Sequence, residues 1–184
     1  MSIFFNTLRL PILVLAAALS LFAAQSTYAK DAHLDREVDA ALKALYQTSP
    51  AAKALGDKAK GILVFPNIVR AGFIVGAQGG DGALIKGGKT VGYYSSGGVS
   101  AGLQAGAQSY GYAVSFMSNK EMKAFERSKG WEIGSGPTLV IVDQGMAKDL
   151  TSTTLKSDIY AFIFDQKGLM GGISLKGSKI SKIK

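Results

Sequence analysis

The residues from Ala83 to Thr90 form the segment of this chain that comes nearest to a known chemical motif. They read ALIKGGKT and fit a relaxed phosphate-binding loop, in which a small residue and four others precede Gly-Lys-Thr. Such a loop binds phosphate because a strand leads into it and a helix follows, with its N-terminal N–H groups facing the anion. Here the strand-like Val91-Gly-Tyr-Tyr94 follows, and Ala83 stands where the motif has glycine. The segment therefore predicts a turn between two strands and no nucleotide site.

The side chains that most often perform catalysis or bind metals are scarce. His33 is the single histidine and cysteine is absent, which excludes the usual zinc sites and Cys–His catalysis. A Ser–His–Asp triad would need His33 at the beginning of the mature chain. Asp81, Glu132 and Asp143 could serve acid–base chemistry, but their spacing singles out no pair. We expect no enzymatic activity, no bound metal and no cofactor.

The basic side chains give the clearest sign of a binding function. They fall into three clusters: one at the Gly87-Gly88 turn, one on a short predicted helix, and one in a carboxyl-terminal tail without acids. The candidate residues are Lys86, Lys89, Lys120, Lys123, Arg127, Lys167, Lys176, Lys179 and Lys182. Converging lysines would attract anionic lipid head groups by roughly 1 kcal/mol each near a membrane surface. The alternative is that they are ordinary solvated charges. We expect no nucleic-acid binding, because no supporting motif accompanies them.

The first residues have the layout of a secretory signal peptide. Arg9 precedes an apolar run over residues 10–24, and Thr27-Tyr28-Ala29 supplies a small-residue cleavage site. The apolar run is shorter than the roughly 20 residues of a spanning helix. We expect a signal peptide over 1–29, with cleavage after Ser26 or an uncleaved anchor as alternatives. The mature chain, residues 30–184, is then one domain, exported and either periplasmic or peripherally membrane-associated.

Three helices are predicted, two of them at the start of the mature chain. Leu34, Val38, Leu42, Leu45 and Tyr46 recur at three- and four-residue steps and form one apolar stripe. A second helix is expected over 50–58, with Ser49 as N-cap and Pro50 at the first position. A third is expected from residue 120, after Ser118-Asn119, and stops at Gly130. The first two could pack as a hairpin on a sheet, whereas a place on a membrane surface is the alternative.

The rest of the chain reads as strands, and its centre is rich in glycine. Residues 71–112 hold 13 of the 23 glycines, interspersed with strand-forming residues. Glycine within strands marks bulges, bends or close backbone approach. We expect separate strands near 60–66, 71–77, 82–85, 89–95, 98–107, 111–117, 138–142, 159–164, 169–175 and 179–183, with a loop over 143–158. This order predicts an α+β fold with a glycine-rich, mainly antiparallel β-sheet or half-barrel, two N-terminal helices and one short inserted helix.

Several of these segments together resemble a known family. They are Lys60–Pro66, Ala71–Gly76, Gly87–Tyr94, Gly102–Gln108, Ser115–Met117, Gly130-Trp131, Gln166–Met170 and Ser174–Ser178. In this order and spacing they are similar to the YSC84-type domain, also called the SYLF domain, and most of all to its exported bacterial members.

The resemblance implies a non-enzymatic lipid-binding domain. Eukaryotic relatives bind phosphoinositide membranes and, in fungi, actin filaments. An exported bacterial protein meets neither, so the resemblance implies binding to anionic phospholipid or lipopolysaccharide phosphates at the envelope, without actin. The alternative is a structural protein whose sheet binds another envelope protein.

Overall fold

The computed structural model of the protein describes residues 31–133, 139–142, 157–168, 175 and 177–184. The chain divides into two compact units, residues 1–36 and 37–184. The predicted signal peptide lies outside the described residues, as do most of the predicted loop over 143–158 and of the predicted strand over 169–175. Among the described residues, no helix combines the length and the apolar character needed to cross a bilayer.

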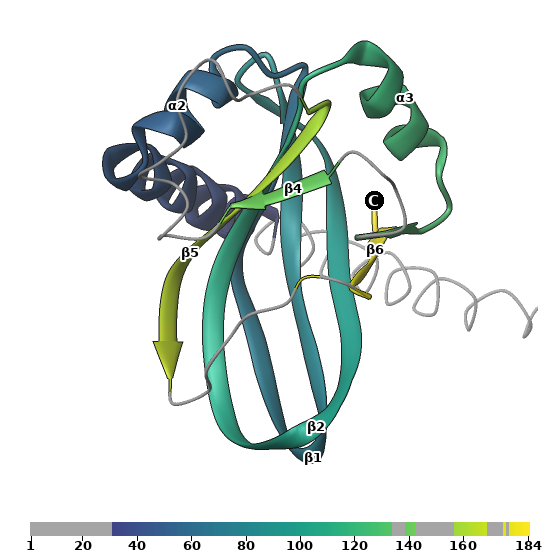
Figure 1. Ribbon diagram of the computed structural model, residues 1–184. Coiled ribbons are helices and arrows are strands. Elements are labelled where there is room, and N and C mark those ends of the chain that lie inside the picture. The colour runs from purple at the N-terminus through teal and green to yellow at the C-terminus, as the bar shows by residue number, and fades with distance from the viewer. Residues whose placement is uncertain (1–30, 134–138, 143–156, 169–174, 176) are drawn as a thin grey trace, which may run out of the picture. The chain divides into compact units, whose positions relative to one another are not determined.

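The second unit is built on one long two-stranded ribbon. Strands β1 (Gly61–Lys86) and β2 (Lys89–Phe116) pair antiparallel from end to end. They join through Gly87 and Gly88, whose φ values of +57° and +76° are those of a two-residue type I′ turn. This confirms the predicted turn in place of a phosphate loop. The ribbon bends about halfway along and doubles back (Figure 1).

The prediction of separate short strands within the ribbon is wrong. Both strands are continuous, and the bends are absorbed by register shifts between Phe65 and Ile68, between Phe73 and Val75, and between Leu84 and Ile85. Pro66, which was expected to end a strand, lies within the first of these shifts. A bulge tolerates proline because the residue there makes no ladder hydrogen bond.

Glycine permits the two halves of β1 to lie against each other. A Cβ added at Gly82 would overlap the carbonyl oxygen of Val64 and come within 2.6 Å of the Phe65 ring, and one added at Gly80 would overlap the Asn67 carbonyl. Gly80 and Gly82 therefore serve close backbone packing, one of the roles that the sequence indicated for these glycines.

Four shorter strands complete a six-stranded sheet in the order β3-β6-β2-β5-β4, with β1 paired to β2. These are β3 (Trp131–Glu132), β4 (Leu139–Val142), β5 (Ile159–Gly168) and β6 (Lys179–Lys182). All pairs are antiparallel except β4 with β5. The fold is α+β with a curled, mainly antiparallel half-barrel, as predicted.

The helices form where capping and apolar spacing favour them. The first occupies residues 31–48 of the described chain, and α2 (Pro50–Gly56) follows. The Ser49 side chain accepts a hydrogen bond from the Ala52 N–H, which confirms the predicted cap. Helix α3 (Asn119–Arg127) begins at the N-cap Ser118 and ends at Ser128, two residues before the predicted stop.

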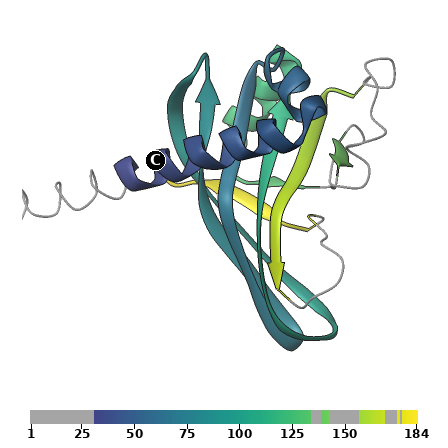
Figure 2. The same cartoon turned by 90° about the vertical axis from the view of Figure 1, so that its left-hand side faces the viewer.

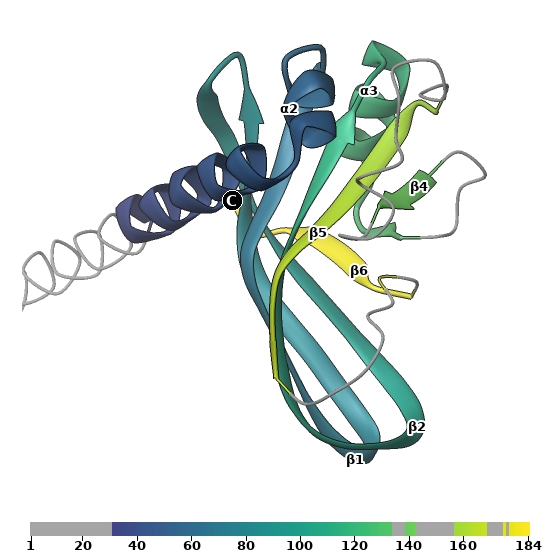
Figure 3. The same ribbon diagram turned by 60° about the vertical axis from the view of Figure 1, so that its left-hand side comes forward.

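The sheet is buried on both faces. Leu63, Phe65, Tyr112, Val114 and Phe116 point into the half-barrel, where α3 closes the core. The alternate residues of the same strands are buried on the other face. There the helix over residues 37–48 runs across the strands, as Figures 2 and 3 show, and its Val38 and Leu45 are buried. The first helices thus pack on the sheet, which was the favoured expectation.

Candidate functional site

Helix α3 carries three cations on the face turned away from the core. Met122 and Phe125 are buried, which fixes the helix's rotation. Lys120, Lys123 and Arg127, at steps of three and four residues, are exposed and lie on the opposite face. The structure therefore brings these three predicted residues together.

The β1–β2 turn reaches the same end of the unit. Lys86 Nζ lies 2.9 Å from a carboxylate oxygen of Glu126 on α3, with both side chains about one-third exposed. Lys89, on the other side of the turn, is exposed. The hairpin and α3 clusters, which are far apart in sequence, thus form one surface, although Glu126 offsets part of the charge of Lys86.

Strand β6 brings the tail lysines to this end as well. Lys182 pairs with Tyr94, whose ring centroid lies 5.0 Å from that of Phe125 on α3. The side chain of Lys179 passes over Gly130, just beyond α3, where a Cβ would lie 2.7 Å from its Cε.

We call this assembly the α3 basic surface. It consists of Lys86, Lys89, Lys120, Lys123, Arg127, Lys179 and Lys182. The segments that form it, 86–89, 119–132 and 179–184, hold nine basic and three acidic side chains. Such an excess of positive charge attracts anions.

Two predicted residues do not join this surface. Lys167 pairs with Ser109 on β2, seven residues along the strand from Phe116 at the α3 end. Seven strand residues span roughly 23 Å. Its Nζ also lies 3.1 Å from the Asp165 carboxylate. Lys176 lies outside the described residues.

A network of buried hydroxyl and amide groups crosses the half-barrel, and the sequence did not reveal it. Tyr112 donates to Ser96 Oγ at 2.7 Å. Tyr110 donates to Gln78 Oε1 at 3.0 Å, and Gln78 donates from Nε2 to Ser178 Oγ at 2.7 Å. Burial raises the pKa of Tyr110 from 10.0 to about 12, although the charge of Arg70 opposes the shift. Burial raises the pKa of Tyr112 further.

Arg70 and Gln108 lie next to this network and were also missed. They are directly paired on β1 and β2, and only 6% and 5% of their respective surfaces are exposed. Arg70 is the only charged residue between Lys60 and Asp81. Because Ile68 is buried and Val69 is exposed, the alternation along β1 places Arg70 on the inner face, which the sequence alone does not show.

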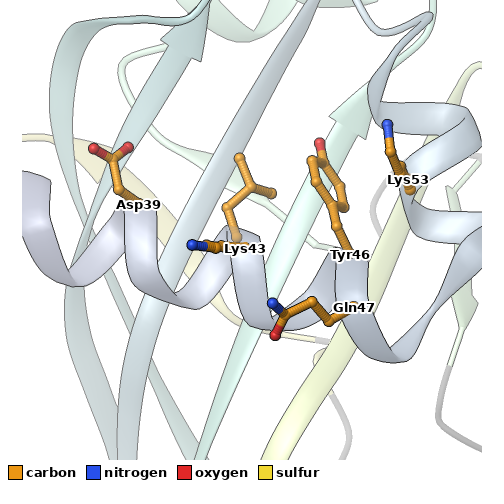
Figure 4. Close-up of a pocket in the computed structure, with 6 residues that line it drawn as sticks. Asp39, Lys43, Tyr46, Gln47 and Lys53 are labelled. Carbon is orange, nitrogen blue, oxygen red and sulfur yellow. The ribbon is translucent and has the colours of Figure 1, made fainter.

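An open groove of about 510 Å³ runs along the first helix (Figure 4). It is lined by Asp39, Leu42, Lys43, Tyr46, Gln47 and Lys53. The ammonium of Lys53 lies 2.9 Å from the Asp57 carboxylate and 6.0 Å from the centre of the Tyr46 ring. The contact of Lys53 with Tyr46 joins α2 to the first helix, whereas the pair with Asp57 lies within α2 and its C-cap. The groove offers neither a nucleophile with an adjacent base nor a cluster of metal ligands.

The other polar residues considered from the sequence do not converge. His33 is exposed on the first helix, Asp81 lies on β1 and Glu132 on β3. Asp143 lies outside the described residues. Within the described ranges, no group of three histidine, aspartate or glutamate side chains is placed to hold a metal ion.

Comparison with known families identifies the carboxyl-terminal half. Residues 97–184 match the family Ysc84, described as "Las17-binding protein actin regulator". Residues 97–184 therefore belong to the Ysc84 family. Among curated proteins, none matches the chain.

The residues that match Ysc84 include much of the site. They begin in β2 and run through α3 and β6, so they contain five members of the α3 basic surface. Lys86 and Lys89 precede the matched residues, as does Arg70, whereas Gln108 lies within them. The family assigns this part of the chain a binding role.

Proposed function

We propose that this Ysc84-family chain binds anionic phospholipid at a membrane surface through the α3 basic surface. The observation that carries the proposal is the convergence of the turn, α3 and β6, which gathers cations that are separate in the sequence. The family resemblance supports lipid as the ligand, because SYLF relatives bind membranes.

The geometry suits a charged, planar partner better than a small ligand. Lys120, Lys123 and Arg127 project from the outward face of α3, and the side chain of Lys120 is 89% exposed. An exposed cation contributes roughly 1 kcal/mol near an anionic membrane, so these three contribute about 3 kcal/mol. Because they are exposed, salt screens the attraction.

Co-flotation of the protein with vesicles tests this proposal. Phosphatidylglycerol vesicles are expected to carry the protein upward at low salt, and binding should weaken as salt is added. Phosphatidylcholine vesicles serve as the control and should carry little protein. Equal recovery of the protein with phosphatidylglycerol and phosphatidylcholine vesicles, at low salt and again at moderate salt, would refute electrostatic membrane binding.

A protein partner is the second candidate, because the description of the Ysc84 family names a protein that binds Las17 and regulates actin. For this chain the partner would be another envelope protein held through the sheet. Pull-down from an envelope extract would support this function if one stoichiometric partner were captured by protein that does not bind vesicles. Vesicle binding without such a partner would reject it.

We further propose that the chain is exported and acts at a bacterial envelope. Support comes from the signal-peptide pattern of residues 1–29 and from the resemblance to exported family members. Amino-terminal sequencing of the protein from its own host should begin at Lys30, or at Thr27 for the alternative cleavage. A protein that retains Met1 and fractionates with the cytoplasm would contradict export.

A further inference from the structure

We propose that Val91 and Ile183 form an apolar patch beside the α3 basic surface, and that this patch inserts into the membrane that the surface attracts. The inference rests on the proposed function and deepens it, because it adds a part of the membrane contact that salt does not screen. It also assigns the end of the molecule that enters the lipid.

Five large apolar side chains are exposed in the part of the chain that the structure describes: Val69, Val75, Val91, Val99 and Ile183. Single exposed apolar residues are ordinary on protein surfaces, so exposure alone does not mark a binding site. Val91 and Ile183 differ from the other three because they lie together and because lysines surround them.

Backbone hydrogen bonds place Val91 and Ile183 at the same end of β2. The Ile183 N–H donates to the Tyr93 carbonyl at 2.8 Å, and the Tyr93 N–H donates to the Lys184 carbonyl at 3.1 Å. Val91 lies two residues before Tyr93 on β2, and neighbouring strands are about 4.8 Å apart. The exposed fractions of Val91 and Ile183 are 48% and 55%. The two side chains thus come from neighbouring positions and present one apolar patch to solvent.

A β-bulge accounts for the exposure of Val91. Leu84 of β1 pairs with Gly92, and the next pair joins Ile85 to Thr90. Val91 is therefore the extra residue of β2 at this point. Bulges re-aim side chains out of the regular alternation, and they are frequent at sheet edges and beside functional sites. The bulge leaves Leu84 in the core while Val91 faces outward.

Exposed lysines border the patch. Lys89 precedes Val91 by two residues, and Lys182 and Lys184 flank Ile183. Strands β2 and β6 contain no acidic side chain. Membrane binding strengthens with the apolar area that is buried and with the attraction to anionic lipid, and a lysine can keep its ammonium among the head groups while its methylenes lie along apolar surface. The patch and its lysines thus fit an anionic lipid layer.

A second copy of the chain is a weaker candidate to cover the patch. Pairing two copies here would bring Lys89, Lys182 and Lys184 of each copy together, and like charges repel. Two half-exposed side chains also offer far less area than the roughly 800 Å² that each partner buries in a stable complex. A membrane requires only shallow insertion, to a depth of roughly 5–10 Å. We therefore assign the patch to lipid.

The exposed valines at the bend of the ribbon provide a contrast. Val75 and Val99 are 64% and 85% exposed, so they present more apolar surface than the patch does. Figures 1 and 3 show the bend at the end of the ribbon opposite α3. Val99 lies eight residues along β2 from Val91, a span of roughly 26 Å. A membrane held at α3 does not reach the bend, so these valines serve as matched controls.

Fluorescent labels at single cysteines identify the residues that enter the lipid. The chain contains no cysteine, so Val91→Cys, Ile183→Cys and Val99→Cys each accept one nitrobenzoxadiazole label, on protein purified from its own host. On phosphatidylglycerol vesicles at low salt, the labels at 91 and 183 should brighten and emit at shorter wavelength. Doxyl-labelled lipid in the vesicles should quench both. The label at 99 should keep the emission that it has in water.

Paired substitutions measure the contribution of the patch to affinity. Val91→Thr/Ile183→Thr keeps β-branched side chains but removes apolar surface, and it should weaken binding to phosphatidylglycerol vesicles at least about tenfold. The dependence of affinity on salt should stay the same, because the lysines remain. The control Val75→Thr/Val99→Thr should stay within about threefold of the wild type. Both variants should melt like the wild type, because the replaced side chains are exposed.

The possible failures are distinguishable. If the wild type floats with phosphatidylglycerol vesicles while the labels at 91 and 183 do not respond, the insertion is refuted and the proposed function stands. A response at 99 in their place would assign insertion to the bend and overturn the inference. A response at 91 to rising protein concentration without vesicles would assign the patch to a second copy. If the wild type does not float with these vesicles, the proposed function fails and the insertion fails with it.

Discussion

Replacing Gly82 with alanine tests whether the ribbon doubles back as closely as the structure shows. The added Cβ would come within 2.6 Å of the Phe65 ring and overlap the Val64 carbonyl, whereas ordinary contacts begin at about 3.4 Å. Val64 and Phe65 are fully buried and one of the contacts is backbone, so the half-strand would have to move by nearly 1 Å. Overpacking of this kind costs about 1–3 kcal/mol, and the backbone contact places Gly82→Ala at the upper end.

Gly79→Ala is the matched control on the same strand. Its nearest neighbour would be the Ser96 carbonyl oxygen at 3.5 Å, an ordinary contact, so its stability should change by less than about 1 kcal/mol. Urea unfolding followed by circular dichroism measures both variants. With a loss of about 3 kcal/mol, Gly82→Ala should melt about 6–12 °C below the wild type. Equal stability of Gly82→Ala and Gly79→Ala would refute the close packing of the two halves of β1.

Three further predictions concern the core and the surface. Because burial raises the pKa of Tyr110 to about 12, the folded chain retains a proton that the unfolded chain loses near pH 10. Tyr110 should therefore lower the free energy of unfolding by about 2–3 kcal/mol as the pH rises from 10 to 12. The raised pKa of Tyr112 adds a decline over the same range, so Tyr110→Phe should remove only the part that Tyr110 contributes, as measured by urea titrations. Gly111→Ala should lose about 1–3 kcal/mol of stability because its Cβ would overlap the Phe164 ring, and adding Phe164→Leu should recover part of that loss. Equal stability of Gly111→Ala and the wild type in urea titrations would contradict this contact. Lys86→Met should reduce vesicle affinity less than Lys123→Met does, because Glu126 already offsets the charge of Lys86. The stability of Lys86→Met should differ from that of the wild type by less than about 1 kcal/mol. A loss of vesicle affinity for Lys86→Met that equals or exceeds the loss for Lys123→Met would contradict the pairing with Glu126.

The class of fold followed from the sequence because its signals are local. Apolar spacing and the Ser49 cap predicted the first helices, and the order of helices and strands along the chain predicted a mainly antiparallel sheet. The turn at Gly87-Gly88 could also be predicted, since two successive glycines suit the positive φ angles of a type I′ turn.

The lengths of β1 and β2 could not be obtained in the same way. Glycines and Pro66 indicate that the backbone bends, but a bend within a paired ribbon and a break between two strands leave the same local pattern. Only the pairing partner distinguishes them. Gly61 pairs with Phe116, and no feature near Gly61 records that partner.

In the candidate site, too, features set by neighbouring residues could be predicted from the sequence, whereas features set by the packing of distant segments could not. The spacing of Lys120, Lys123 and Arg127 on α3 could be read directly, because residues three and four apart share a helix face. The meeting of Lys86 with Glu126 could not, since it depends on how the hairpin packs against α3. The burial of Arg70 with Gln108 was missed because the two residues meet only when β1 and β2 are placed side by side.

The most direct test of the proposed function compares two variants that lose the same charge at different places. Lys120→Gln/Lys123→Gln removes two cations from the α3 basic surface, whereas Lys43→Gln/Lys167→Gln removes two exposed lysines that lie outside it. Partitioning onto phosphatidylglycerol vesicles at low salt should weaken by about 2 kcal/mol, roughly 30-fold, for the first variant. The second should stay within about threefold of the wild type, which corresponds to less than about 0.7 kcal/mol. Equal losses for the two variants would show that net charge alone drives binding and would contradict a membrane-binding surface at α3.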